Sequence, residues 1–329
     1  MVFLFRDKSI INIFFLILLS IAVHAHLFIA DPVLLVDKND GFISLSILLS
    51  TYATQMSPTF LFVIYQLIIL LQAIRLNMVL TDFRMYQSTN YTTAMTYILL
   101  TGIVGQWCSI SAALISNSLV LWIFILLSRL YNNQSPRTLL FNIGMLVSLT
   151  IIAYHPTAIL IMVVLFALAV VRPFRPVEWI LLLMGVLLPY YFLSAYLFLN
   201  DQLITIKQYL PIFQLHYPFV HPDIWFWISI GYLMAALIAG IFYWQKFNNR
   251  MVIQIRKNWA VMMVLLLILV VAPFLFIGAG MDTAILSLIP LTAFVANAYS
   301  YPKRLLFPNL LFWLAVVIIV HNNWGLIKK

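Results

Sequence analysis

The chain is a succession of long apolar runs separated by short polar stretches, and this pattern limits what it can fold into. Of its 329 residues, 64% are hydrophobic and 8% are charged, whereas a soluble domain carries roughly 25% charged residues. Runs of about 16–22 apolar residues suit helices that cross the hydrocarbon core of a bilayer. We therefore predict about eleven membrane-spanning helices, at residues 9–30, 57–74, 91–106, 110–128, 138–154, 156–171, 178–200, 224–244, 259–279, 283–299 and 305–321.

The loops between these runs differ in charge, and the difference predicts the orientation of the chain. With the N-terminus inside, all six histidines and six of the nine acidic residues fall on the outer side. Most of the 18 Lys and Arg residues fall on the cytoplasmic side, in line with the positive-inside rule. We therefore predict a cytoplasmic N-terminus and an outer C-terminus. The basic residues left on the outer side are Lys38, Lys207, Lys328 and Lys329.

Residues 41–56 are apolar enough to form one more span, but the charge distribution argues against it. A span at this point would invert every later loop and move most of the basic residues to the outer side. We therefore expect one interfacial helix in the first outer loop, lying along the outer surface of the membrane. Pro58 would then open the second span, since proline is favoured at the first position of a helix.

The predicted fold class is all-α: a polytopic integral membrane protein in which residues 1–329 form a single transmembrane domain. The expected location is a bacterial inner membrane, crossed several times. The net charge of +9 is spread over short cytoplasmic loops, which excludes a nucleic-acid partner and leaves membrane lipids as expected partners. The predicted spans contain almost no ionisable side chains, which argues against an ion-coupled transporter.

Candidate catalytic residues lie in the first outer loop, where Asp31 and Asp37 stand close to Lys38 in the sequence. A carboxylate just outside the membrane can act as a general base on an acceptor hydroxyl, and a lysine can hold a lipid phosphate. We expect no cofactor and no metal centre, because no histidine pair has the H-x-x-x-H spacing of a zinc site. A divalent cation on the outer carboxylates is the alternative.

The second outer loop, residues 201–223, is rich in aromatic residues and prolines. Its rings can stack on sugars or line a groove for a lipid chain, or they can anchor the protein at the lipid–water boundary. Lys207 is a second candidate for the lipid phosphate. His155 stands in a tight outer hairpin before Pro156 and could shape the same site. The remaining candidates for substrate binding are Tyr209, His216 and His221.

The chain resembles GT-C-type glycosyltransferases in three features. It has about eleven predicted spans, a short inner N-terminus, and acidic residues in the first outer loop followed by an interfacial helix (residues 31–56). Members of that family often carry two adjacent acidic residues in this loop, whereas the aspartates here are separated. The chain also looks like the multi-spanning bacterial polysaccharide polymerases. The resemblance implies transfer of a sugar at the outer leaflet from a polyprenyl-phosphate-linked donor.

On this interpretation Asp31 or Asp37 deprotonates the acceptor, and Lys38 or Lys207 holds the donor phosphate. Two other functions remain open at this point. The chain could be a non-enzymatic scaffold or assembly subunit of a cell-envelope complex, with partner proteins in that complex. It could also be a flippase for a lipid carrier.

The predicted orientation can be tested with reporter fusions. Fusions at Arg137 and Lys257 should report a cytoplasmic position, and fusions at Asp37 and Gln214 a periplasmic one, because the first two lie in basic loops. The measurement is paired phosphatase and fluorescent-protein activity in whole cells. Reversed signals at Arg137 and Lys257 would rule out the orientation.

Overall fold

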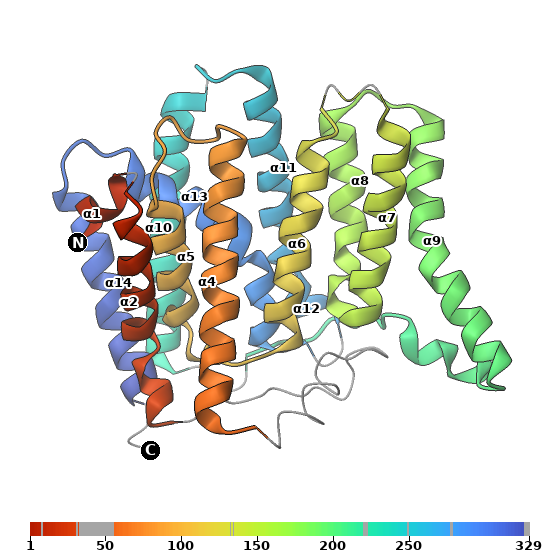
Figure 1. The fold of residues 1–329 in the computed structure, drawn as a ribbon, viewed down its shortest axis with the longest axis horizontal. Helices are drawn as coiled ribbons and strands as arrows, with labels where there is room; N and C mark the ends of the chain where they lie inside the picture. Colours follow the sequence, from red (N-terminus) through yellow and green to blue (C-terminus); the bar gives the residue numbers. More distant parts are fainter. Residues whose placement is uncertain are drawn as a thin grey trace.

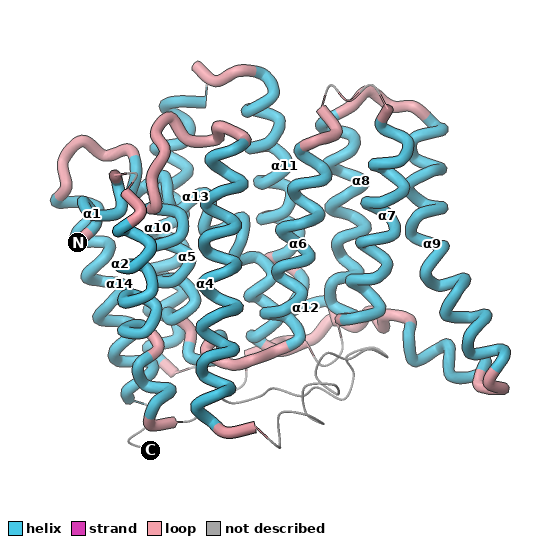
Figure 2. The backbone as a smooth tube through the Cα atoms, viewed as in Figure 1, coloured by secondary structure: helices cyan, strands magenta, loops and turns pink. Residues whose placement is uncertain are grey.

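The computed structural model describes residues 1–7, 9–30, 32, 56–131, 133, 135–219, 223–248, 250–276 and 279–325. In these residues the fold is helical, and the long helices run side by side as one bundle (Figures 1 and 2). The α-helices are α1 (Val2–Arg6), α2 (Ile11–Val23), α4 (Pro58–Asp82), α5 (Thr92–Ile103), α6 (Ala112–Ser128), α7 (Pro136–Ala153), α8 (Leu160–Val171), α9 (Pro176–Leu199), α10 (Ile224–Asn248), α11 (Ile253–Leu269), α12 (Ala272–Leu275), α13 (Leu288–Ser300) and α14 (Leu306–Gly325). Short 3₁₀ segments are η1 (Ala25–Phe28), η2 (Gly105–Trp107), η3 (His155–Ile159), η4 (Leu203–Tyr209) and η5 (Met281–Ser287).

Seven helical units in the described residues are long and apolar enough to cross a bilayer: α4, α7, α9, α10, α11 with α12, η5 with α13, and α14. Four shorter apolar units, α2, α5, α6 and η3 with α8, lie beside them in the bundle. A twelve-residue helix such as α5 spans only about 18 Å of a hydrocarbon core that is about 30 Å thick. The prediction of an all-helical protein with several membrane-spanning helices is confirmed for the described residues, whereas the count of eleven spans and the orientation stay predictions.

The connections between helices gather at the two ends of the bundle (Figure 1). The connections α4–α5, α6–α7, α8–α9, α10–α11 and α13–α14 lie at the upper end of the view, and α5–α6, α7–η3 and α9–α10 lie at the lower end. The upper connections are the basic ones, and they contain Arg84, Arg129, Arg172, Arg175, Arg250, Lys303 and Arg304.

Several helix ends differ from the sequence-based boundaries. The helix α4 continues to Asp82, although the apolar run ends at residue 74, so Arg75 lies inside the helix rather than in a loop. The extension also contains the polar residue Asn77, which is buried against the bundle. Packing against other helices therefore stabilises this part of α4, although its sequence is less apolar than the part before it. The expected interfacial helix at residues 41–56 lies outside the described residues except for Met56.

The two helices α5 and α13 form the centre of the bundle. Every residue of α5 is buried, and so is every residue of α13 except the last. Helix α5 packs against α2, α4, α13 and α14, and α13 packs against α5, α10 and α11. A helix that is apolar on all sides is stable when it is surrounded by other helices or by lipid. Here α5 and α13 are surrounded by other helices.

Small residues let pairs of helices approach closely. A Cβ at Gly144 on α7 would lie 2.2 Å from the Leu182 carbonyl oxygen, and one at Gly185 on α9 would lie 2.3 Å from the Phe141 oxygen. A Cβ at Gly240 on α10 would lie 2.1 Å from the backbone of α13. Glycine at such crossings is typical of membrane helices, because backbone contact replaces the hydrophobic driving force that lipid removes.

Two arginines hold the upper connections together. Arg6 on α1 donates from Nε and Nη2 to the carbonyl of Tyr299, at 2.9 and 2.6 Å, and from Nη1 to that of Pro302 at 2.9 Å. These bonds supply donors to the C-terminal end of α13, where carbonyl groups lack partners within the helix.

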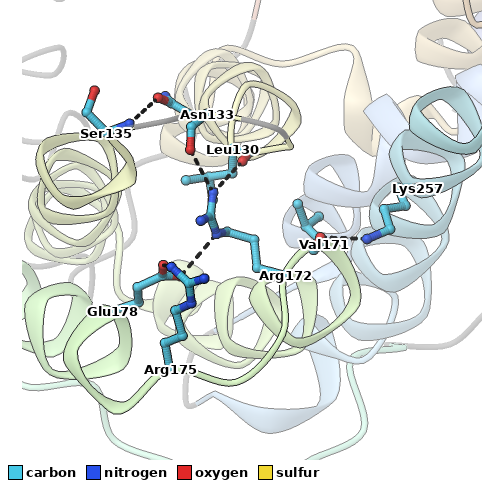
Figure 3. A network of polar contacts seen from close by, with 8 residues as sticks. All are labelled: Leu130, Asn133, Ser135, Val171, Arg172, Arg175, Glu178 and Lys257. Atoms are coloured by element: carbon cyan, nitrogen blue, oxygen red, sulfur yellow. Dashed lines mark hydrogen bonds and ion pairs between the residues drawn. The ribbon is translucent and has the colours of Figure 1, made fainter.

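Arg172 plays the corresponding part between α8 and α9 (Figure 3). Its Nη1 donates to the carbonyls of Leu130 and Asn133 in the α6–α7 connection, at 3.1 and 3.2 Å. Its Nε lies 3.1 Å from Glu178 Oε2, and Lys257 on α11 donates to a carbonyl at the end of α8 at 2.7 Å. The ends of four neighbouring helices are thus joined by one polar cluster.

Replacing Gly185 by alanine tests the close crossing of α7 and α9. The added methyl group would collide with the backbone of α7, so we expect a loss of about 1–3 kcal/mol of stability. The matched control is Gly231→Ala on α10, where a Cβ meets no atom within 4 Å, and which should gain roughly 0.5–1 kcal/mol from helix propensity. Thermal unfolding in detergent measures both, and equal shifts would contradict the close crossing.

Candidate functional site

The C-terminal half of α9 bends away from its neighbour α7 at a proline. Pro189 lies inside α9 and has no N–H to donate to the carbonyl four residues earlier, which kinks a helix. The two helices α7 and α9 meet closely at Gly144 and Gly185, one turn before the proline. Beyond this point the lower part of α9 leads away from α7 (Figure 1).

A groove occupies the space between the diverging halves, and we call it the α7–α9 groove. Its volume is about 400 Å³, which is within the range of about 300–1,000 Å³ typical of ligand pockets. Phe192 and Tyr196 on its wall are 62% and 56% exposed, and Leu149 is 47% exposed, so the groove opens sideways from the bundle. It is lined by Met145, Leu149, Ile152, Leu188, Pro189, Phe192, Leu193 and Tyr196.

The lining of the α7–α9 groove is apolar apart from the hydroxyl group of Tyr196. An apolar chain is the ligand that such a surface can hold, since it offers nearly no hydrogen-bonding group to a polar one. Because the groove faces outward from a membrane-embedded bundle, a chain could enter it from the bilayer without crossing water. The site therefore suits the hydrocarbon part of a lipid.

The outer connections next to the groove carry several of the residues that the sequence singles out. His155 is half-buried at the start of η3, directly after α7. The segment η4 follows α9 and packs against it, with Lys207 exposed and Tyr209 buried. Burial raises the pKa of the Tyr209 hydroxyl, so this group stays protonated at neutral pH. The groove thus has polar groups in the segments that continue its two walls.

The second outer loop is fixed by a short extended pairing. The amide groups of Gln214 and His216 donate to the carbonyls of Leu275 and Phe274, at 2.9 and 3.1 Å, and Phe213 forms an antiparallel bridge with Phe276. The pairing leaves several apolar side chains on the outside of this loop. They are Ile212, Phe213, Leu215 and Tyr217, each more than 60% exposed.

His216 reinforces this pairing with its side chain. Its Nε2 lies 2.7 Å from the carbonyl oxygen of Ala279, and because a carbonyl only accepts, Nε2 must carry the proton. The other ring nitrogen is buried. In this arrangement His216 positions the loop, and neither ring nitrogen faces the α7–α9 groove as a free base.

A second group of polar residues is buried among the helices themselves. The ring of His24 is fully buried, with Nδ1 3.0 Å from the Ser20 carbonyl and Nε2 3.4 Å from Thr101 Oγ1. Asn323 on α14 donates to the Gly102 carbonyl at 2.9 Å. These contacts join α2, α5 and α14, so His24 has a packing role.

The other predicted site residues lie outside the described part of the chain: Asp31, Asp37, Lys38 and His221. That Asp31 or Asp37 approaches His155 or the loop at residues 207–223, as we expect of a single site, stays a prediction. In the part that is described, no three His, Cys, Asp or Glu side chains gather closely enough to hold a metal ion.

Sequence reasoning did not find the α7–α9 groove, because its lining consists of ordinary apolar residues of two spans. Two signals were available: the proline inside the run at 178–200, and a glycine in each of the two helices. A proline after a close helix crossing indicates where two membrane helices can part. Neither signal says which helices are neighbours, and the groove depends on that.

Comparisons with protein-family models, with curated proteins and with solved structures find no match to this chain. The functional argument therefore rests on the chemistry of the site itself.

Replacing His216 by alanine should loosen the second outer loop. The loss of the bond to Ala279 should speed exchange of the Gln214 and His216 amide protons about five- to tenfold. Hydrogen exchange read by mass spectrometry measures this. Gln214→Ala is the control, since it removes an exposed side chain and keeps the backbone bond. Unchanged exchange in His216→Ala would show that the side chain does not hold the loop.

Proposed function

We propose that this protein is a membrane glycosyltransferase that takes a sugar from a polyprenyl-phosphate-linked donor at the outer leaflet. In this proposal the seven long and four shorter apolar helical units all cross the membrane of a bacterial cell, with the N-terminus inside and the C-terminus outside. The lower end of the bundle in Figure 1 is then the outer end. The donor and the acceptor meet at that end.

The observation that supports this proposal most is the α7–α9 groove. It is apolar, it opens sideways, and it lies between the outer halves of two helices. The segments that continue its walls carry His155, Lys207 and Tyr209. A lipid-linked sugar needs both parts of such a site, a surface for its chain in the membrane and polar groups for its phosphate and sugar outside it.

The proposed chemistry is a substitution at the anomeric carbon of the donor sugar. Asp31 or Asp37 takes the proton of an acceptor hydroxyl, and the hydroxyl oxygen forms the new glycosidic bond. The bond between the anomeric carbon and the phosphate oxygen breaks, and the phosphate leaves with the electron pair. Lys38 or Lys207 stabilises the charge that develops on this phosphate. His155 and the loop with Tyr209, His216 and His221 shape the space for the sugar.

A non-enzymatic scaffold is the second candidate, and the same groove is the observation that favours it. A transmembrane helix of an envelope partner could pack its apolar face between α7 and α9 instead of a lipid chain. The two proposals differ in what the groove binds and in whether the outer carboxylates are needed. Transfer activity and lipid binding therefore separate them.

Filling the groove tests whether it holds a polyprenyl chain. Leu193→Trp should reduce crosslinking of a photoreactive polyprenyl phosphate in nanodiscs at least tenfold, because the larger ring occupies the groove. Ile180→Trp is the control, since Ile180 is 56% exposed on the same helix but does not line the groove. If both variants are labelled as strongly as the unaltered chain, the groove does not bind the polyprenyl chain.

Substituting the outer carboxylates tests the enzyme directly. Asp31→Asn or Asp37→Asn should leave the protein inserted and folded but lower sugar transfer by about 10²–10⁴-fold, the usual contribution of a general base. The assay follows a labelled sugar from a polyprenyl-phosphate donor to acceptors from cell envelopes. Full sugar transfer by the double Asn variant would show that neither Asp31 nor Asp37 is the catalytic base. No transfer by the unaltered chain, together with a partner helix crosslinked in the groove, would favour the scaffold.

A further inference from the structure

An arginine on the lipid-facing side of α4 is the starting point of a separate site. Arg75 is exposed, seven residues before the end of α4 at Asp82, which places it about 10 Å along the helix from that end. It makes no hydrogen bond or ion pair with the described residues. The neighbours on this face, Leu71 and Met78, are 60% and 48% exposed, so the face is apolar around the charge.

A charge on such a face needs a partner. An arginine within the hydrocarbon region is unfavourable unless it reaches an interface or pairs with another group. Arg75 lines a groove of about 370 Å³ between α4 and α6, and none of the residues lining it is acidic. No acidic side chain of the described residues pairs with Arg75, which leaves an anionic group from the surrounding membrane as the partner we consider.

The floor of this groove is polar and held in a fixed geometry. The side-chain nitrogen of Gln72 donates to the Leu114 carbonyl and to Ser118 Oγ, both at 2.7 Å. The side-chain oxygen of Gln72 accepts from the hydroxyl of Tyr97. Ser118 is thus an acceptor for Gln72 and keeps its own hydroxyl proton for a ligand. Gln72 and Arg75 are three residues apart, so they share a face of α4.

The wall of the groove suits a lipid chain. Trp122 on α6 is 54% exposed, and together with Leu71 it provides an apolar surface beside the polar floor. A phosphate bound by the Arg75 guanidinium would accept paired hydrogen bonds from it. The acyl chains would run over Leu71, which lies one turn from Arg75 towards the middle of α4, and Trp122 would pack beside the headgroup end of the lipid. A free anion would leave this apolar wall uncovered.

We propose that the groove between α4 and α6 is a binding site for an anionic phospholipid, with Arg75 and Ser118 holding its phosphate. The site has its arginine in the half of α4 that leads into the basic α4–α5 connection, away from the end proposed for glycosyl transfer. It is therefore distinct from the α7–α9 groove, and it stands whether or not the chain is an enzyme. The occupant is a lipid of the surrounding membrane.

The test is lipid retention in native mass spectrometry. The protein is released from nanodiscs that contain equal amounts of phosphatidylglycerol and phosphatidylcholine. The unaltered chain should retain phosphatidylglycerol preferentially, and Arg75→Gln should reduce that retention about tenfold or more, since a hydrogen-bonded charge pair contributes roughly 1.5–3 kcal/mol. Arg75→Lys should retain an intermediate amount, because lysine cannot form the paired bonds.

The matched control is Arg137→Gln, which removes an exposed positive charge at the start of α7. Its lipid retention should equal that of the unaltered chain, and melting temperatures in phosphatidylcholine alone should be the same for both glutamine variants. Equal retention in Arg75→Gln and the unaltered chain would overturn the proposal. Equal losses of bound phosphatidylglycerol in the two glutamine variants would also overturn it. Displacement of the lipid by inorganic phosphate would do the same, and so would a dimer of the chain that dissociates only in Arg75→Gln.

Discussion

The burial of α5 and α13 on every side is the constraint on which the rest of the bundle depends. In a bilayer, lipid tails are as apolar as the helices, so helices associate through close packing and hydrogen bonds rather than through the hydrophobic effect. Helix α5 meets this demand with polar side chains that its neighbours satisfy: Tyr97 donates to Gln72 on α4 and accepts from Asn117 on α6. At its start, Thr92 contacts Ser300 at the end of α13. The polar groups at the centre thereby fix which helices lie next to which.

The helices at the periphery of the bundle have fewer packing contacts than α5 and α13, and both grooves lie on these peripheral helices. Only 22% of the most apolar part of α9 is buried, against 89% for η5 with α13. A helix with so few neighbours can bend at Pro189 without breaking contacts in the core, and the space that opens is the α7–α9 groove. The face of α4 with Arg75 is free for a similar reason, because the contacts of this helix are concentrated on its opposite side, where Tyr65, Ile69 and Leu76 are fully buried. Both proposed ligand sites therefore lie on the periphery of the bundle.

The sequence was sufficient for the fold class because one property, apolar run length, decides it. The apolar helices lie where the runs predict them, and the basic connections gather at one end of the bundle. Helix ends were harder: α4 passes through Arg75 and Asn77 to Asp82, because packing against the bundle outweighs local hydropathy. For the site, titratable residues could be named from their loops, but their partners could not. His216 proved to bond the Ala279 carbonyl, which is 63 residues away, and no local pattern encodes that contact.

The link between Arg6 and the end of α13 has a consequence for assembly. The arginine lies on α1, while its acceptors, the carbonyls of Tyr299 and Pro302, are made 293 and 296 residues later. A chain that stops before α13 can keep the contact of α1 with α5, where the Tyr91 amide donates to the Phe5 carbonyl, but it lacks the three bonds from Arg6. The two ends of the bundle that these bonds join can therefore be linked only after α13 has been made, so this link forms late in biogenesis.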